Sequence, residues 1–169
     1  GRLDREKNVI ALLEIIKESD LNSIWKFQII GDGPERKNLE DYVHQNDLEE
    51  RTVFFGNQPI DEVVKLLQKS KIFVFTSLKE ALPTVLIEAM MTGNAIIAYD
   101  CNYGPSDIIN ENNGFLIPLH DKKMFIEKLE YLTHNPEVLN DLMKSSFEES
   151  KKWKKEKPIE QWKSLLNSN

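Results

Sequence analysis

The feature that most constrains the fold is a regular alternation of short apolar segments with longer amphipathic ones. Five largely apolar segments predict β-strands, at residues 25–30, 52–55, 72–75, 94–99 and 115–117. Around them, apolar residues at helical spacing predict helices at residues 6–19, 34–45, 60–68, 83–92, 105–109 and 122–133. Strands that are apolar on both faces need helices on both sides, which indicates a parallel sheet. The sequence therefore predicts an α/β fold with a Rossmann-like, doubly wound parallel sheet.

The length and charge of the chain narrow its class further. At 169 residues it has room for one domain with a substantial core. A formal net charge of −6 argues against a nucleic-acid-binding protein, which usually carries a basic face. The apolar runs are too short to span a membrane, and the single cysteine, Cys101, cannot form an internal disulfide. We therefore expect a cytoplasmic domain.

The two ends of the chain differ from its centre. The chain opens on Gly1, Arg2 and Leu3 rather than on methionine, and this opening looks like the end of a strand. We therefore expect a piece of a longer protein, in which residues 1–169 form one domain. At the other end, residues 136–169 predict two closing, lysine-rich helices that break near Pro158. Acidic residues are mixed with the lysines there, so a solvated helix is favoured over contact with an anionic membrane surface.

Polar or glycine-rich segments follow the predicted strands, at residues 31–36, 56–60, 77–84 and 100–107. Because ligands of parallel sheets bind at the carboxyl ends of the strands, we expect these segments to form one rim. Gly33 allows either a tight turn or close approach to a ligand, and the turn is favoured because Arg36 occupies the third glycine position of a dinucleotide fingerprint. Residues 100–107 could line a sugar pocket or form only a turn.

Two carboxylates, Glu80 and Glu88, flank a helix start that is marked by Pro83. With Pro83 at the first helical position, the amides of residues 84–86 would be free to donate to a phosphate, and the helix dipole would add to the attraction. A carboxylate can accept two hydrogen bonds from the vicinal hydroxyls of a ribose. The alternative is that both are ordinary solvated side chains. Composition favours neither interpretation.

Arg2 and Lys7 would enter the same rim at the start of the first helix. A guanidinium and an ammonium together can hold a diphosphate and stabilise its charge as it leaves. By spacing alone, a solvated helix start with Asp4 and Glu6 as mixed charge is the simpler interpretation. The three histidines lack metal-ligand spacing and there is no D-x-D pair, so we expect neither a metal ion nor a cofactor.

Several motifs in order turn these general features into a specific resemblance. They are G-R-L-x-x-x-K-N, I-I-G-D-G-P, V-F-F-G, F-V-F-T-S-x-x-E-A-L-P-T-V-L-I-E-A-M-x-x-G, Y-G-P-S-D-I-I and N-G-F-L-I-P, over residues 1–118. The pattern resembles the C-terminal half of the GT-B retaining glycosyltransferases of family 4, which carry an E-x7-E motif. The resemblance implies a nucleotide-sugar donor site, with a UDP-sugar favoured, in a metal-independent enzyme. Residues 136–169 resemble the closing segment of that family.

The resemblance also implies roles for single residues. Arg2 and Lys7 would bind the donor diphosphate and Glu80 the donor sugar, and these three form the implied catalytic set. Glu88 would hold the ribose hydroxyls. The implied donor-binding set is completed by Gly33, Gln58, Ile60, Ala81, Leu82, Pro83, Thr84 and Val85. An N-terminal domain, absent from this chain, would bind a glycan or lipid-linked acceptor, so we expect the isolated domain to be inactive.

Departures from the family pattern leave the sugar open. Ala81 and Leu82 stand where glycine and phenylalanine are common, which leaves the backbone near the sugar less free. The Y-G-P-S-D-I-I stretch looks most like the corresponding stretch of bacterial enzymes of cell-surface polysaccharide synthesis. Such an enzyme would associate peripherally with the inner face of the cell membrane. Two alternatives remain: a nucleotide-sugar epimerase or phosphorylase of similar shape, and a flavodoxin-like binding module with Asp100 as its phosphoacceptor.

Overall fold

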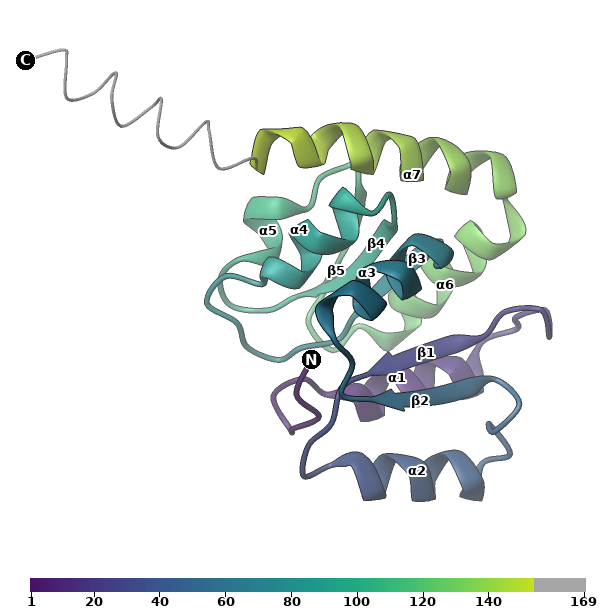
Figure 1. The fold of residues 1–169 in the computed structure, drawn as a ribbon. Coiled ribbons are helices and arrows are strands. Elements are labelled where there is room, and N and C mark those ends of the chain that lie inside the picture. The colour runs from purple at the N-terminus through teal and green to yellow at the C-terminus, as the bar shows by residue number, and fades with distance from the viewer. Residues whose placement is uncertain (154–169) are drawn as a thin grey trace, which may run out of the picture.

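The computed structural model describes residues 1–153 of the chain (Figure 1). Its strands are β1 (Phe27–Ile30), β2 (Thr52–Gly56), β3 (Ile72–Phe75), β4 (Ala95–Asp100) and β5 (Gly114–Pro118). Its helices are α1 (Val9–Glu18), α2 (Arg36–Gln45), α3 (Ile60–Lys69), α4 (Thr84–Met91), α5 (Pro105–Ile108), α6 (Lys122–His134) and α7 (Pro136–Ser150), followed by a short 3-10 helix at Lys151–Trp153. Strands and helices alternate as predicted, so the α/β fold class is confirmed. Within the described part of the chain, no helix is long and apolar enough to cross a membrane.

Three helices begin later than the sequence pattern predicts. α1 begins at Val9 because the preceding turns end on Asn8, which has left-handed backbone with a φ of 50°. α2 begins at Arg36, after a turn. α4 begins at Thr84, so Pro83 is its N-cap residue and not, as predicted, its first helical residue. The predicted helix break near Pro158 lies outside the described residues.

All strand pairs are parallel, as predicted, but the strands of the described residues form two sheets rather than one. β1 pairs with β2, and β3, β4 and β5 form a second sheet with β4 in its centre. Figure 1 shows the two groups set apart, with the N-terminus between them. We call the first group the two-stranded side and the second the three-stranded side.

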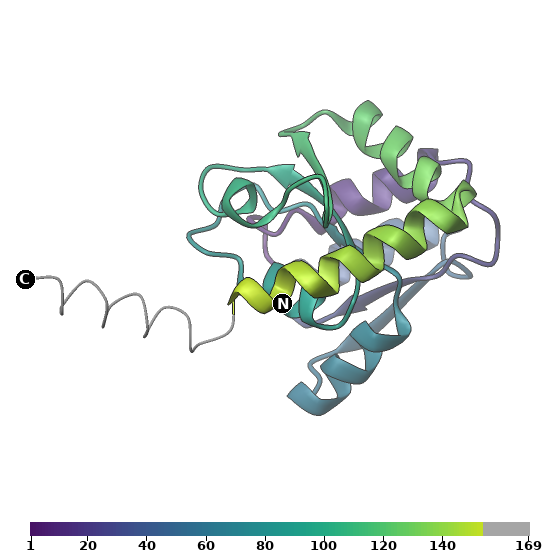
Figure 2. The same ribbon diagram turned by 90° about the horizontal axis from the view of Figure 1, so that it is seen from above.

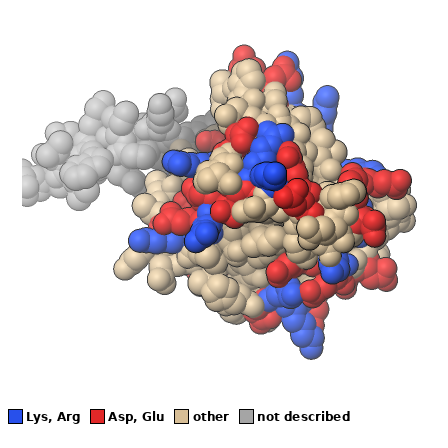
Figure 3. All heavy atoms as spheres, turned by 90° about the horizontal axis from the view of Figure 1, so that it is seen from below, with Lys and Arg blue, Asp and Glu red and all other residues tan. Residues whose placement is uncertain are grey.

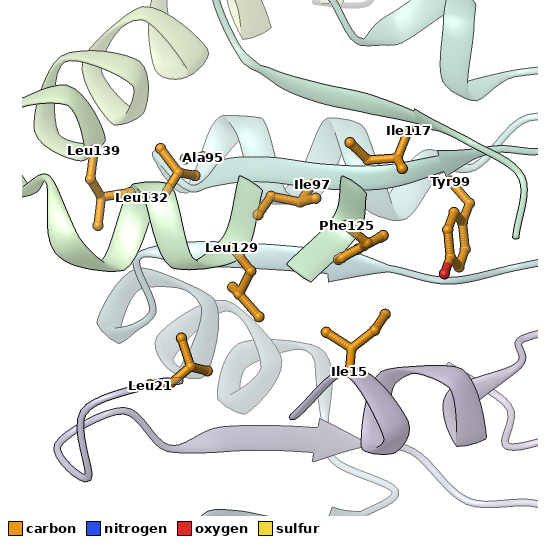
Figure 4. Close-up of a cluster of buried hydrophobic side chains, with 10 residues drawn as sticks. All are labelled: Ile15, Leu21, Ala95, Ile97, Tyr99, Ile117, Phe125, Leu129, Leu132 and Leu139. Atoms are coloured by element: carbon orange, nitrogen blue, oxygen red, sulfur yellow. The ribbon is translucent and has the colours of Figure 1, made fainter. Parts of the chain in front are cut away.

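The three-stranded side has the doubly wound arrangement that the apolar strands predict. Ala95, Ile97 and Tyr99 of β4 pack on one face, in a cluster that α6 completes. In this cluster the rings of Tyr99 and Phe125 meet edge to face, with their centroids 4.9 Å apart (Figure 4). The alternate residues of β4 face a second cluster formed with α4 and α5. Both faces of β4 are therefore dry, which explains why its sequence has no polar alternation.

The two-stranded side has a smaller core. Ile29 of β1 packs with Leu13 of α1 and Leu39 of α2, in a cluster that also contains Leu3, Ile16, Val43 and Leu48. Ile29 is the only fully buried residue of β1, whereas Val53 of β2 is 43% exposed. Helices α1 and α2 thus pack on β1 mainly through this one hydrophobic cluster.

α7 closes the three-stranded side, where it packs against α4, α6 and β4 (Figure 2). Lysines of α7 and of the 3-10 helix that follows it have acidic partners: Lys144 lies 3.5 Å from Asp141, and Lys152 lies 2.6 Å from Glu149. On the opposite face of the molecule, basic and acidic side chains are interspersed (Figure 3). A solvated helix is the interpretation that these ion pairs favour.

Candidate functional site

The four charged residues singled out from the sequence line one cavity. This cavity of about 680 Å³ has Arg2, Lys7, Glu80 and Glu88 among its lining residues, together with residues 82–85. They come from two regions far apart in the chain: the loop before α1, and the loop after β3 together with the α4 helix that follows it. The loop before α1 thus meets the carboxyl end of β3, the end of a parallel strand where ligands of α/β folds bind.

Lys7 and Glu80 form an ion pair across 73 residues of sequence, with Lys7 Nζ donating to Glu80 Oε1. The side chains are 33% and 13% exposed, so the pair is largely shielded from water. A charge pair in such a place interacts more strongly than one on the open surface. Glu80 is therefore not the ordinary surface residue that the simpler interpretation allowed.

Backbone and side-chain bonds fix the loop that carries Lys7. The Lys7 amide donates to Asp4 Oδ1 at 3.1 Å. Thr76, at the carboxyl end of β3, donates from Oγ1 to the Asn8 carbonyl at 3.1 Å, with a 3.3 Å contact to the Lys7 carbonyl. Next to it, the Leu78 amide donates to the Glu6 carbonyl at 2.8 Å. The loop before α1 is therefore held against the end of β3.

The sequence analysis did not single out Thr76, although it positions Lys7. A threonine at a strand end is ordinary, and its role depends on a partner loop that is distant in the sequence. Its place at the carboxyl end of a buried strand was the only available signal. In the structure Thr76 is 5% exposed, so its hydroxyl needs the backbone acceptors that the Lys7 loop supplies.

Arg2 is the freest member of the cluster. Its side chain is 75% exposed, and Nε lies 3.9 Å from Asp4 Oδ2. Its backbone is held by its neighbours, because the Gly1 amine donates to the Ile30 carbonyl and the Leu3 amide to the Asp32 carbonyl. The guanidinium can therefore reorient toward a ligand while its Cα stays in place.

Glu88 lies on the open face of α4. Its neighbours in the sequence, Leu86, Ala89 and Met90, are apolar. Those three are fully buried, but the helical period turns Glu88 away from them, and its side chain is exposed toward the cavity. Glu88 therefore does not carry the cost of a buried, unpaired carboxylate.

The start of α4 has fewer available amides than the sequence analysis expected. The Thr84 amide donates to the Leu82 carbonyl and the Leu86 amide to the Pro83 carbonyl, both at 2.9 Å. Of residues 84–86, only Val85 has an amide with no recorded backbone partner within residues 1–153. The expectation of three free donors is therefore wrong, because α4 begins one residue later and its first turn is tight.

The remaining predicted residues are more scattered. Gln58 lines a neighbouring cavity of about 540 Å³, which Arg2 also lines, and its Nε2 donates to the Phe55 carbonyl at 2.7 Å. Ile60 is 65% exposed at the start of α3 and lies in the lining of neither cavity. Gly33 packs against the backbone of Leu3, where a Cβ would come within 2.3 Å of the Leu3 oxygen. Close packing therefore explains this glycine, in line with the turn interpretation.

The loops after β3 and β4 are pressed together beside the cavity. Lys79 and Asn102 form a parallel bridge. A Cβ at Gly104 would lie 2.4 Å from Pro83 Cδ and 3.3 Å from the Ala81 oxygen. Ala81 itself is thus a backbone contact of the loop after β4. Glycine is required at position 104 because its φ is +94° and because Pro83 leaves no room for a side chain.

Cys101 lies near this rim but is a packing residue. It is 1% exposed, and burial raises the pKa of its thiol, with the nearby Glu80 charge acting in the same direction. A protonated, buried thiol is a poor nucleophile. The chemistry of the site therefore depends on its charged oxygens and nitrogens.

Comparison with known proteins places this site in context. A family model described as glycosyl transferases group 1 matches residues 1–152. The chain is 29% identical over 167 residues to the amylovoran biosynthesis glycosyltransferase AmsD of Erwinia amylovora, covering 99% of this chain and 46% of that protein. It is 31% identical over 169 residues to an α-1,4-N-acetyl-D-galactosaminyltransferase of Campylobacter jejuni that is named for a diphosphoundecaprenol-linked glycan, covering 98% of this chain and 46% of that protein. The chain thus spans less than half the length of these relatives.

Solved structures of glycosyltransferases are also similar to this chain. A mutant of S. aureus TarM in complex with UDP, fondaparinux and α-GlcNAc-glycerol superposes with a TM-score of 0.88 at 28% identity, covering 99% of this chain and 34% of that one. HepE of Anabaena in complex with UDP has the same TM-score at 19% identity, and this likeness concerns the fold alone.

Proposed function

Because the chain belongs to the family of glycosyl transferases group 1, we propose that it is the donor-binding domain of a retaining, family 4 glycosyltransferase. The donor is a nucleotide-sugar, with a UDP-sugar favoured, and the acceptor is a glycan or lipid-linked glycan of bacterial surface polysaccharide synthesis. The observation that carries the proposal is the convergence of Arg2, Lys7, Glu80 and Glu88 on one cavity. The acceptor is bound by an N-terminal domain outside this chain, which leaves the isolated domain inactive.

The Lys7–Glu80 pair can serve a diphosphate and a sugar at the same time. An ammonium has three donors, so Lys7 keeps its bond to Glu80 and still donates to a phosphate oxygen. The second oxygen of Glu80 remains available to accept from a sugar hydroxyl. Arg2, exposed and attached to a fixed backbone, reorients to hold the other phosphate through its planar fork.

The start of α4 supplies the remaining polar contacts. The Val85 amide and the positive end of the helix dipole favour an anion there. Glu88, exposed toward the same cavity, accepts from the two ribose hydroxyls. Two cations and a helix end offset the charge that develops on the leaving diphosphate, so we propose transfer without a metal ion.

The location of the enzyme follows from the proposed acceptor. A lipid-linked acceptor lies at a membrane, so we propose a cytoplasmic enzyme that works at the inner face of the cell membrane. The paired lysines of α7 and of the 3-10 helix after it favour contact through the N-terminal domain or the acceptor over direct binding of this domain to lipid.

Titration calorimetry with UDP, GDP and ADP tests the donor site directly. We expect UDP to bind, and Glu88→Ala to weaken it by about ten- to one hundredfold, since the ribose loses a charged acceptor. Glu127→Ala is the matched control, because Glu127 is an exposed helical glutamate on α6 outside this cavity. Absence of heat from all three nucleotides at millimolar concentration would contradict the proposal.

A second variant separates the phosphate contact from the nucleoside contact. Lys7→Met should weaken UDP by about tenfold or more but leave the weak binding of uridine unchanged, because only UDP carries the diphosphate. Equal losses for UDP and uridine would mean that Lys7 supports the loop and does not contact phosphate.

A further inference from the structure

An exposed tyrosine occupies a strained backbone position on the loop after β4. Within residues 1–153, four residues other than glycine have a positive φ: Asn8, Asp47, Tyr103 and His120. Asparagine, aspartate and histidine are enriched in the left-handed region, whereas a bulky tyrosine is an outlier there. Tyr103 has a φ of 69°, and such strain persists only where the surrounding structure offsets it.

Packing of the tyrosine ring does not account for this strain. Tyr103 is 78% exposed, the largest value among the exposed large hydrophobic side chains of the described residues. The two aromatic ring pairs within residues 1–153 are formed by other side chains. Because strained residues cluster at functional sites, an exposed one that does not pack indicates contact with a ligand.

The backbone that carries Tyr103 is held in place. β3 and β4 are parallel neighbours, so the loops that follow them leave the same end of the sheet (Figure 1). Asn102 forms a bridge with Lys79, and Gly104 packs against Pro83, so the residues on both sides of the tyrosine contact the loop after β3. An exposed ring on a fixed loop loses little backbone entropy when it binds a ligand.

This fixed loop lies beside the carboxylate proposed to hold the donor sugar. The bridge at Lys79 lies one residue before Glu80, which lines the larger cavity together with Leu82. Residues 100–103 line neither of the two cavities described above. Leu82 is 53% exposed and adds apolar surface between the cavity and the loop after β4. Tyr103 therefore lies next to the donor cavity and not inside it.

The side chains on this loop suit a polar ligand that has an apolar face. Asp100 and Asn102 are exposed close to Tyr103 in the sequence, so a carboxylate and an amide are available to bind hydroxyls. A sugar ring carries hydroxyls at its edge and C–H groups on its faces. An aromatic ring can cover such an apolar face while neighbouring polar groups bind the edge.

The charge near this loop favours a neutral ligand over another phosphate. Burial raises the pKa of the Cys101 thiol, and the negative charges of Glu80 and Asp100 raise this pKa further. The opposing effect of Lys7 on the same thiol is smaller than either of these charge effects. A phosphate close to Cys101 would therefore meet net repulsion, whereas a neutral sugar would not.

We propose that the loop after β4 is a carbohydrate-binding edge of the site, where the ring of Tyr103 stacks on the apolar face of a sugar ring of the acceptor. Asp100 and Asn102 bind hydroxyls of that sugar. This role rests on the function proposed above, because the sugar held at Glu80 is taken as the donor and the sugar at Tyr103 as the acceptor. The N-terminal domain binds the remainder of the acceptor glycan, and Tyr103 supports its terminal sugar from the donor side.

Nuclear magnetic resonance with a small glycoside tests this contact. The probe is methyl β-galactoside, which carries several ring C–H groups on one face, and glycerol is the control that has hydroxyls but no ring. Saturation transfer from the protein to each compound is followed over a titration. We expect weak binding of methyl β-galactoside and none of glycerol.

Variants of the tyrosine assign the binding to its ring. Tyr103→Ala should weaken binding of the glycoside by about two- to tenfold, whereas Tyr103→Phe keeps the ring and should bind as before. Tyr131→Ala is the matched control, because Tyr131 is a 45% exposed tyrosine on α6 that lines neither cavity. Tyr103→Gly should lose binding and yet raise the urea midpoint, because glycine adopts a left-handed φ without strain.

Several outcomes would overturn the proposal. Unchanged glycoside binding by Tyr103→Ala, or an equal loss in Tyr131→Ala, would mean that the ring of Tyr103 makes no specific contact. A lower urea midpoint for Tyr103→Gly would mean that the tyrosine is retained for the fold. Displacement of the glycoside by UDP-glucose would assign the ring to the donor sugar.

A separate titration with UDP distinguishes failure of this role from failure of the donor site. Tyr103→Ala should bind UDP as the unchanged chain does, because Tyr103 lies outside the donor cavity. Loss of glycoside binding with UDP binding retained is the expected result for this variant. Loss of both would mean that Tyr103 supports the loop that carries Glu80 and does not contact a second sugar.

Discussion

The two sides of the molecule are built from the same kind of unit but are unequally buried. On the three-stranded side, all of residues 95–99 are buried, because β4 has a strand on each edge and a cluster on each face. On the two-stranded side, Ile29 is the only fully buried residue of β1. The comparison teaches that burial in this fold depends on the number of neighbouring strands as much as on the apolar character of a strand.

The candidate site lies where these two sides meet. Lys7 comes from the loop before α1, and Glu80 from the loop after β3. Their ion pair and the Thr76 hydrogen bonds are therefore contacts between the sides. A site of this kind can be disturbed from either side, and the following changes measure how unequal the two are.

The largest effect is expected from the core of the three-stranded side. Phe125→Ala removes a fully buried ring that packs on Tyr99, and should lower the free energy of unfolding by about 3–5 kcal/mol. Val53→Ala on the two-stranded side should cost less than about 1 kcal/mol, because that side chain is 43% exposed. Urea unfolding followed by circular dichroism gives both values, and similar losses would remove the asymmetry described above.

A smaller effect is expected at the start of α6. Asp121 Oδ1 accepts from the Met124 amide at 3.0 Å and caps this helix. Asp121→Ala should cost about 1 kcal/mol in the free energy of unfolding, whereas Asp121→Asn should cost little, because asparagine is an equally good cap. If both variants lose the same amount, the charge of Asp121 matters more than its hydrogen bond.

The smallest effect is expected from the Gly1 amine, between the two sides. Desolvation, and after it the charge of Lys7, lowers the pKa of this amine in the folded state. Between that lowered pKa and about 8, the ordinary pKa of an α-amine, the unfolded chain therefore binds more protons at Gly1 than the folded chain does. The free energy of unfolding should therefore rise with pH through the window below that value and level off above it. Nα-acetylation should abolish this rise.

The measurement is best made in a His44→Gln background. Glu49 raises the pKa of His44, whose contribution is present at low pH and is lost as the pH rises through that raised value. The change in the free energy of unfolding that His44 causes with pH has the opposite sign to the change that the Gly1 amine causes, and would mask it. A rise that survives acetylation would assign the effect to another group.

The sequence predicted the fold well because its signals are local. The apolar strands and amphipathic helices have periods that a short window reveals, and the elements predicted between residues 6 and 133 are present within a few residues. The start of α4 was misplaced by one residue because proline suits both the N-cap and the first turn. The division into two sheets could not be predicted, because strand order depends on pairing between distant segments.

The site was predicted in composition but not in its contacts. The four charged residues of the cavity were singled out because strand ends converge in a parallel sheet and because the family resemblance implied roles for them. The pairing of Lys7 with Glu80 joins positions 73 residues apart, and no local pattern indicates it. The sequence left the exposure of Glu88 open, because its apolar neighbours do not show which face of the helix it occupies.

The Lys7–Glu80 ion pair also affects which ligands the site binds weakly. An ammonium already balanced by a carboxylate exerts little net pull on a small anion such as inorganic phosphate, which would also meet repulsion from Glu80. A molecule that presents an anionic group and a hydroxyl side by side satisfies both partners at once. The ion pair would thus favour binding of a sugar joined to a phosphate over binding of the many free phosphates of a cell.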